Sequence, residues 1–268
     1  MAGPLRSLTR AQGTQIRQLL QDRALRQAEG AFVMEGAHAC QDLIRLYPDQ
    51  ILSLVLTAEY LQREGPEARA ARAVVAAPQW LCEPSVLAKL SEVEAPQGLL
   101  AVVRQPQWRE ADLWTQSDLL GVYGERLQDP ANVGTIIRTA AALNLTGVWL
   151  SHESVDCFHP KVVRATAGAI MAIPVFQGVP VTTLTQQGGA VYAAVVASSG
   201  AVPLHTLPNR SPRAVIALGN ESRGLTAATA DEAHVRFTIP LARGVESLNV
   251  AATFAMAAYY LRALPFQR

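Results

Sequence analysis

The C-terminal part of this chain contains a stretch, Ser247–Leu261, in which no residue carries a charge. A helix that is apolar on nearly all sides must be buried on nearly all sides, and this one is shorter than the ~20 apolar residues that span a bilayer. A short loop, Ile239–Glu246, precedes it, and Ser247 and Asn249 offer side-chain oxygens that suit a helix start. We therefore expect a strand, a sharply turning loop and a buried helix to meet at one place.

The overall charge and the cysteine content exclude several classes of protein. The formal net charge of the 268 residues is +1, which excludes a strongly basic protein that coats nucleic acid. A local basic patch is still possible, because the first 29 residues contain five arginines against two acidic residues, an excess of three. The three cysteines lie far apart and the histidines lack metal-ligand spacing, so neither a disulfide framework nor a metal site is predicted. Without an apolar leader or a membrane segment, the sequence predicts a soluble, cytoplasmic protein.

Short apolar runs alternate with helical patterns through both halves of the chain, which predicts an α/β fold. A polar segment with a proline separates the halves, so we expect a smaller N-terminal α/β domain over residues 1–105, a linker over 106–117 and a second domain over 118–268. The second domain is expected to contain five or six mostly parallel strands. Residues 1–30 are expected to form one amphipathic helix that is either solvated or in contact with RNA.

The first polar motif follows the strand predicted at residues 119–123. Asn132 is expected to cap the next helix, and Gly134 leaves room for a close neighbour. Arg138 lies on the same helix among apolar neighbours, and a charge on so apolar a helix is typical of a residue that serves a partner. Ligands bind beyond the carboxyl ends of parallel strands, which is where this motif falls.

The second polar motif, Gly219–Leu225, follows the strand predicted at residues 214–218. Its two glycines indicate a backbone that bends tightly and approaches a ligand closely. It is not a P-loop, and no G-x-G-x-x-G is present, so a nucleotide-dependent oxidoreductase lacks support. Ser198, Ser199 and Ser222 lack the G-x-S-x-G context of a hydrolase nucleophile. Glu221 is either a functional group or an ordinary loop carboxylate.

Together the three segments read N-x-G-x-x-x-R-x-A, G-x-E-x-x-G-L and I-P-L…S-L-N-V-A. In this order and spacing they resemble the motifs of the SpoU/TrmH family, which are SPOUT-class RNA ribose 2′-O-methyltransferases that use S-adenosylmethionine. The resemblance covers roughly Leu119–Ala258 and includes Pro160–Ala165. Residues 32–36 and 92–98, with Glu94 among them, are similar to the L30e-like substrate-binding domain that many members carry.

The resemblance implies a knotted C-terminal methyltransferase domain that dimerises through its last helix. It implies that the catalytic groups are Arg138, Asn132, Glu221, Ser247 and Asn249. It implies that the cofactor lies against Leu218, Gly219, Asn220, Gly224, Ile239, Leu241, Leu248 and Asn249. The motif 3 loop departs from many relatives by carrying Ala242 and Arg243, and Arg243 is expected to point outward, towards RNA.

Arginines and a lysine are the expected RNA contacts, since the net charge is so small. The candidates are Arg6, Arg10, Arg17, Arg23, Arg26, Lys161, Arg164 and Arg243. Ribosomal RNA is the favoured substrate, while transfer RNA, an antibiotic-resistance role and a catalytically silent RNA-binding protein on the same scaffold remain alternatives. Arg138 either acts as the base or stabilises the developing alkoxide while water takes the proton. The second role costs less because arginine is protonated at neutral pH.

Overall fold

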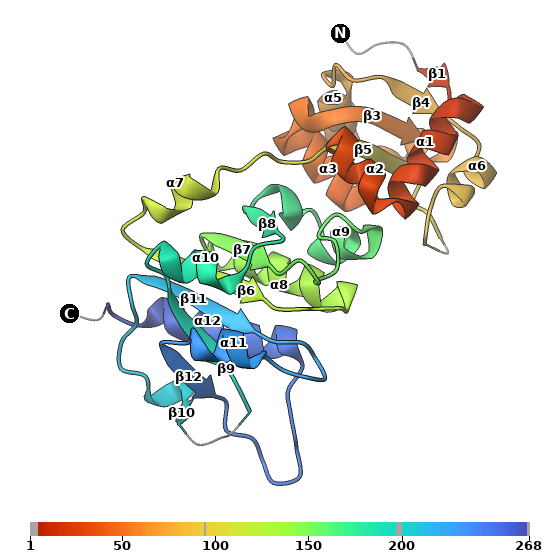
Figure 1. Cartoon of the computed structure of the whole chain (residues 1–268). Coiled ribbons are helices and arrows are strands. Elements are labelled where there is room, and N and C mark those ends of the chain that lie inside the picture. The colour runs from red at the N-terminus through yellow and green to blue at the C-terminus, as the bar shows by residue number, and fades with distance from the viewer. Residues whose placement is uncertain (1–4, 94, 197–199, 267–268) are drawn as a thin grey trace. The chain divides into compact units, whose positions relative to one another are not determined.

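The computed structural model describes residues 5–93, 95–196 and 200–266, so Glu94, Ser198 and Ser199 lie outside the described residues. The chain divides into two compact units. The first comprises the residues up to Gln107 together with the segment 158–168, and the second comprises residues 108–157 and those from Ala169 onwards. Figure 1 follows the chain from red to blue through both units.

The first unit is built on a five-stranded sheet in the order β1-β4-β3-β5-β2, in which β5 runs antiparallel to β2 and β3. Its strands are β1 (Arg6–Ser7), β2 (Ala31–Glu35), β3 (Ile51–Leu56), β4 (Gln79–Leu81) and β5 (Leu99–Arg104). Its helices are α1 (Arg10–Gln21), α2 (Arg23–Glu29), α3 (Ala37–Leu46), α4 (Ala58–Arg63), α5 (Pro66–Ala73), α6 (Pro84–Lys89) and α9 (Pro160–Thr166), with a 3-10 turn at Pro48–Gln50.

The N-terminal segment is more divided than the sequence predicts, and the expectation of one helix over residues 1–30 is wrong. Thr9 caps α1 in a reciprocal hydrogen-bonded pair with Gln12. Asp22 then interrupts the helix in an extended conformation, and its side chain accepts hydrogen bonds from the backbone N–H groups of Ala24 and Leu25, which starts α2. A side chain that satisfies the free donors of a new helix makes the break favourable. Ile16 and Leu19 of α1 are buried against the sheet, as the apolar spacing indicates.

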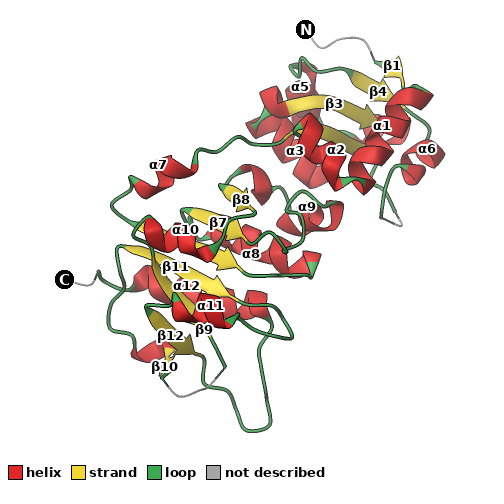
Figure 2. Ribbon diagram, in the orientation of Figure 1, coloured by secondary structure: helices red, strands yellow, loops and turns green. Residues whose placement is uncertain are grey.

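The second unit contains a seven-stranded sheet in the order β10-β12-β9-β11-β6-β7-β8, and every pairing in it is parallel. Its strands are β6 (Leu119–Gly124), β7 (Gly147–Leu150), β8 (Val175–Gln177), β9 (Ala190–Ala194), β10 (Val202–Pro203), β11 (Arg213–Leu218) and β12 (Val235–Thr238). Its helices are α7 (Glu110–Trp114), α8 (Pro130–Ala142), α10 (Val181–Gln186), α11 (Ala227–Asp231) and α12 (Val250–Ala263), with 3-10 turns at Ala169–Met171 and Leu204–Thr206. Helices lie on both faces of this sheet (Figure 2).

The parallel order confirms the predicted open α/β sheet, with seven strands where five or six were expected. The extra strand, β10, has only two residues, and so short a run carries no recognisable pattern. Part of the segment predicted as a linker is α7, whose Leu113 and Trp114 are buried in the core of this unit. Trp149 packs against Trp114 with ring centroids 5.6 Å apart and donates a hydrogen bond to Glu110 Oε1 at 2.8 Å.

Candidate active site

The three polar motifs follow β6, β11 and β12, all in one parallel sheet. Because parallel strands end at the same edge, the three loops leave the sheet on one side, where ligands of such sheets bind. β11 and β6 are direct neighbours in register from Arg213–Leu119 to Leu218–Gly124, so the first two motifs start side by side. The predicted placement of all three motifs at strand ends is confirmed.

The first loop turns into α8 at Asp129, not at Asn132. Asp129 is the N-cap and accepts a hydrogen bond from the N–H of Ala131, and Pro130 occupies the first helical position. Proline suits that position because its missing N–H is not needed there. Asn132 is buried in the first turn of α8. The prediction that Asn132 caps this helix is wrong, because Asp129 occupies the cap position.

The Asn132 side chain instead connects the three motifs. Its Nδ2 donates to Glu221 Oε1 at 3.1 Å, and its Oδ1 accepts from Asn249 Nδ2 at 2.9 Å. Residues separated by 89 and by 117 positions in the chain thereby form one continuous polar chain. We call Glu221, Asn132 and Asn249 the motif triad.

Glu221 lies at the N-terminal end of α8 and receives further donors there. The backbone N–H groups of Asp129 and Gln128 point to its two carboxylate oxygens at 3.3 and 3.5 Å. Burial works to raise the pKa of the Glu221 carboxyl, but hydrogen bonds from its own backbone, from Asn132 and from these two N–H groups outweigh burial and lower it. The carboxylate is thus held ionised at neutral pH and its orientation is defined.

The second loop closes on itself between Asn220 and Gly224, whose backbones exchange hydrogen bonds of 3.1 and 2.8 Å. A Cβ on Gly219 would lie 2.1 Å from the backbone of Gly224 and of Leu225, so only glycine permits this closure. Gly224 has φ +66°, a conformation that glycine adopts at little cost. Asn220 holds the turn through its Oδ1, and its Nδ2 donates to the carbonyl of Arg126 in the first loop at 2.9 Å.

A buried carboxylate, Glu125, connects the start of the first loop to the helix that follows the second loop. The sequence interpretation missed this residue. Glu125 directly follows β6 and is 6% exposed. Its oxygens accept from the N–H and hydroxyl of Thr226, both at 2.7 Å, and from the hydroxyl of Thr229 at 2.6 Å. Thr226 is the N-cap of α11. A glutamate directly after a buried strand was the available signal, since a buried carboxylate requires hydrogen-bond donors.

The third loop leads from β12 to α12, and the helix begins at Val250. Asn249 is its N-cap and accepts from the N–H groups of Ala251 and Ala252 at 2.9 and 3.2 Å, so Asn249 both caps the helix and joins the motif triad. Of the two residues predicted to start the helix, Asn249 is confirmed as the cap and Ser247 is not. Ser247 is an exposed loop residue, because one side-chain cap suffices and Asn249 occupies that position.

The remaining predicted site residues differ in their exposure. Arg138 is exposed on α8, and among the described residues no hydrogen bond or ion pair engages its guanidinium. Leu218 is buried, Gly219, Asn220, Ile239 and Leu241 are half-buried, and Gly224 and Leu248 are exposed. These glycine and aliphatic residues lie in loops at the edge of the sheet or, like Leu218, at the strand end before one. Such loops can hold a flat heterocycle by apolar contact and by hydrogen bonds from the main chain. The residues present therefore fit an adenosine-containing cofactor.

The predicted RNA contacts separate into available and engaged side chains. Arg6, Arg10, Arg17, Lys161 and Arg243 are exposed, and Arg23 is half-buried. Arg26 is 2% exposed and donates to the carbonyls of Leu19 and Leu20, so its assignment to RNA is corrected: it satisfies the end of α1. Arg164 pairs with Glu35 and Glu92, each at 3.6 Å, within the first unit, so its charge already has partners there.

The part of the chain that the structure describes offers neither a cluster of metal ligands nor a membrane-spanning helix. No group of three or more histidine, cysteine, aspartate or glutamate side chains there could hold a metal ion. None of the helices described has the length and apolar character needed to cross a membrane.

Comparison with known proteins assigns both halves of the chain to described families. Residues 120–259 match the SpoU rRNA methylase family. Residues 14–101 match the MRM3-like substrate-binding domain.

Individual proteins show the same similarity, two of them over nearly the whole chain. An uncharacterised tRNA/rRNA methyltransferase of Synechocystis is 32% identical over 92% of this chain and 89% of its own. The 23S rRNA (guanosine(2553)-2′-O)-methyltransferase RlmP of Bacillus subtilis is 35% identical over 65% of this chain and 68% of its own. The crystal structure of an AdoMet-bound rRNA methyltransferase from Sinorhizobium meliloti superposes with a TM-score of 0.82 at 27% identity and covers 97% of both chains.

Proposed function

This chain belongs to the SpoU rRNA methylase family, and on that premise we propose that its motif triad belongs to a site that transfers a methyl group from S-adenosylmethionine to a ribose 2′-hydroxyl of ribosomal RNA. One observation carries the proposal. Asn132 joins Glu221 and Asn249 by hydrogen bonds of 3.1 and 2.9 Å, so the three family motifs form one connected site.

S-adenosylmethionine supplies an electrophilic methyl group on a positively charged sulfur. The residues that would hold it are the backbones of Gly219, Ile239 and Leu248, with Leu218 and Leu241 at its sides. Asn220 and Gly224 would keep the second loop closed around it, as their mutual hydrogen bonds support. Asn249 would contribute from the helix start, and Ser247 would complete the wall of the exposed loop.

The side chains of this protein have three tasks: to position the hydroxyl, to stabilise the charge that grows on its oxygen and to let its proton leave. Positioning alone can lower a barrier by several kcal/mol. The hydrogen bond that Asn132 donates to Glu221 holds both side chains in place, which suits them for positioning the hydroxyl. Arg138 stabilises the developing alkoxide with its positive charge while water takes the proton, because a guanidinium is protonated at neutral pH and makes a poor base.

RNA binding is assigned to the first unit, which matches a substrate-binding domain, together with the exposed cations. Arg6, Arg10, Arg17 and Lys161 have the exposure that phosphate contacts require, and Arg243 adds a charge beside the third motif. Phosphate contacts release counterions, so the affinity for RNA should fall steeply between low and moderate salt. An affinity that barely changes with salt would remove these residues from the RNA interface.

The proposal includes a homodimer formed through α12. One stripe of this helix remains uncovered in the single chain: Met256 is 41% and Tyr259 72% exposed, and Ala252 and Ala263 lie on the same stripe. An uncharged exposed stripe is typical of a protein–protein interface. A Tyr259→Glu variant should elute as a monomer while the wild type elutes as a dimer, with Arg262→Glu as the matched control.

The family's knotted topology and a location in the cytoplasm, where ribosomes are assembled, are parts of the same proposal.

The decisive experiment maps ribose methylation in RNA from cells with and without the gene. One or a few ribosomal RNA positions should lose their 2′-O-methyl group when the protein is absent and regain it on re-expression. Re-expression of Arg138→Ala should not restore it. Loss of methylation at a transfer RNA position alone would replace the substrate, and unchanged methylation everywhere would contradict the proposed activity.

A further inference from the structure

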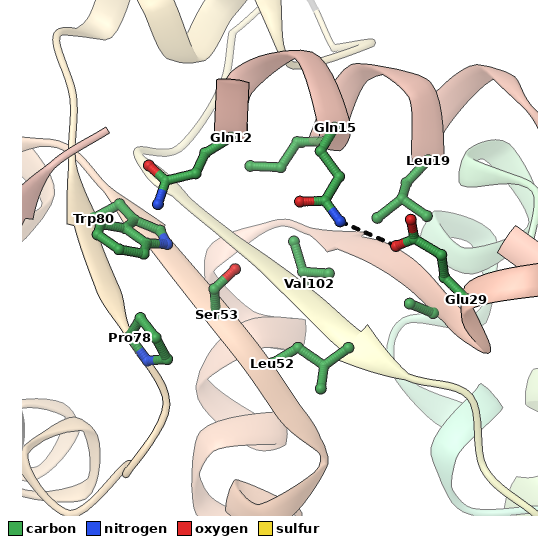
Figure 3. Close-up of a pocket in the computed structure, with 11 residues that line it drawn as sticks. Gln12, Gln15, Leu19, Glu29, Leu52, Ser53, Pro78, Trp80 and Val102 are labelled. Carbon is green, nitrogen blue, oxygen red and sulfur yellow. Dashed lines mark hydrogen bonds between the residues drawn. The ribbon is translucent and has the colours of Figure 1, made fainter. Parts of the chain in front are cut away.

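The first unit contains a cavity of about 290 Å³ between α1 and the sheet, whereas the motif triad belongs to the second unit. Its floor is formed by apolar side chains of α1, β3 and β5, among them Leu19, Leu52 and Val102. Pockets of about 300–1,000 Å³ take small ligands, so this cavity has room for a single flat ring system. Figure 3 shows Gln12 and Gln15 on α1 facing residues of the sheet across this space.

An aromatic face and several polar groups converge on this space. Trp80, on β4, is half-buried and lines one side, and the amide of Gln12 lies beside its indole (Figure 3). On another side, Gln15 Nε2 donates to Glu29 Oε2 at 3.1 Å, which fixes an exposed carboxylate at the cavity (Figure 3). The hydroxyl-bearing side chain of Ser53 also belongs to the lining.

The combination of an indole face with amide and carboxylate groups is the chemistry that recognises a nucleobase. Proteins read single-stranded RNA by stacking unpaired bases on aromatic side chains and by hydrogen-bonding their edges. A carboxylate accepts from the amino groups of adenine, cytosine or guanine, whereas uracil has no amino group. Glu29 Oε2 is already oriented by Gln15, and the carboxylate's other oxygen, Oε1, has no hydrogen-bond partner among the described residues.

A positive charge lies next to the aromatic wall, where the backbone phosphate of such a base requires one. Arg6 on β1 is the register partner of Trp80 on β4, and partners in register project from the same face of a sheet. Arg6 is exposed. This charge favours a nucleotide of an RNA chain over an uncharged apolar ligand, because the apolar floor alone would serve either.

We propose that this cavity is a base-reading site that holds one unpaired, amino-bearing base of the RNA substrate, stacked on Trp80 and hydrogen-bonded by Glu29. The inference rests on the proposed function for its choice of RNA as the ligand. It assigns sequence discrimination to the first unit, whereas phosphate contacts elsewhere supply affinity without sequence information.

The test measures binding of fluorescein-labelled rA6, rC6 and rU6 to the full-length protein by anisotropy at one fixed salt concentration. The wild type should bind rA6 and rC6 more tightly than rU6. Trp80→Ala should weaken rA6 and rC6 binding about tenfold, the scale of one lost base stack, and Trp80→Phe should retain most of the affinity. Trp108→Ala removes a tryptophan that is 39% exposed outside the cavity and should bind like the wild type.

Glu29→Ala provides the sharper arm, because Glu29 is exposed and its replacement should not affect folding. Alanine removes the acceptor, whereas glutamine would keep one in its amide oxygen. Glu29→Ala should bring rA6 and rC6 affinity to the level of rU6 while Trp80 remains in place. Equal binding of all three oligonucleotides by the wild type, or unchanged selectivity in Glu29→Ala, would overturn the proposal. If Trp80→Ala melts early, Trp80→Phe and Glu29→Ala still decide the question. Oligonucleotide binding needs no methyl transfer, so failure of the proposed activity would be recognised separately, by methylation mapping.

Discussion

Two glutamates, Glu125 and Glu221, lie at the same end of the seven-stranded sheet and have opposite surroundings. Glu125 is buried, and its carboxylate accepts hydrogen bonds from Thr226 and Thr229 at the start of α11. Glu221 is exposed, and its bonds run through Asn132 to Asn249 across all three motifs. One carboxylate holds the loops together from inside, and the other is exposed at the proposed site.

The comparison indicates how this sheet edge combines rigidity with access. Buried, fully bonded groups stabilise a loop but cannot reach a ligand, while exposed groups can do so only if something else fixes their positions. Glu125 ties the first loop to the helix that follows the second loop. The stability of these loops therefore does not depend on Glu221 alone. Substitutions on the exposed side should therefore change catalysis, and those on the buried side should change stability.

The largest effect is expected from Arg138→Ala, on the exposed side. Removal of a group that stabilises charge in a transition state typically costs 10²–10³-fold in rate, about 3–4 kcal/mol. The rate in a single-turnover assay should fall by this amount while S-adenosylmethionine still binds in calorimetry. Arg109→Ala, which removes an arginine with an 83% exposed side chain, is the control. A retained rate in Arg138→Ala would exclude both roles considered for this residue.

Glu125→Ala should give the next largest effect, and it should be on stability. The variant leaves the N–H and hydroxyl of Thr226 and the hydroxyl of Thr229 without their acceptor, and hydrogen bonds to a charged group contribute about 1.5–3 kcal/mol. Urea unfolding should show a loss of about 2–3 kcal/mol. Glu246→Ala, at an exposed loop position, should change the unfolding free energy little. If Glu125→Ala unfolds like the wild type, the buried network does not stabilise the loops.

Asn249→Ala belongs to both sides of the comparison, because Asn249 caps α12 and reaches Asn132. Loss of the cap should cost about 1 kcal/mol of stability. Affinity for S-adenosylmethionine should weaken in calorimetry. Asn249→Asp separates the two effects, since aspartate caps a helix equally well but cannot donate to Asn132 Oδ1. Unchanged cofactor affinity in the alanine variant would assign Asn249 to RNA instead.

The smallest effect concerns the pH dependence of Glu221. Its pKa is lowered from 4.5 in the folded protein, so its contribution to stability is present above the unfolded pKa and is lost as pH falls through the lower folded pKa. The difference in unfolding free energy between the wild type and Glu221→Gln should therefore be constant above about pH 5 and shrink below pH 4.5. Solvent screens the exposed carboxylate, which keeps the difference small. A difference that grows on acidification would contradict the assigned direction.

The motifs were predictable because each joins a strand pattern to residues with specific backbone or polar properties. Gly219 is an example, since the closure at Gly224 excludes every side chain. The sequence did not separate competing caps: Asp129 and Asn132 are three residues apart and both suit a helix start. It also did not show that Arg26 folds back onto the carbonyls of α1, because the same arginine pattern describes an exposed helix face.

The sequence alone determined the alternation of strands and helices, the order of the three motifs and hence the family. These depend on local periodicity and on residue types whose properties hold in any context. Only the tertiary structure decided that Asn132 joins Glu221 and Asn249, that Glu125 is buried among threonine hydroxyls, and that Trp80 borders a cavity. Those contacts join residues far apart in the chain, and burial and hydrogen-bond geometry arise only when distant segments pack together.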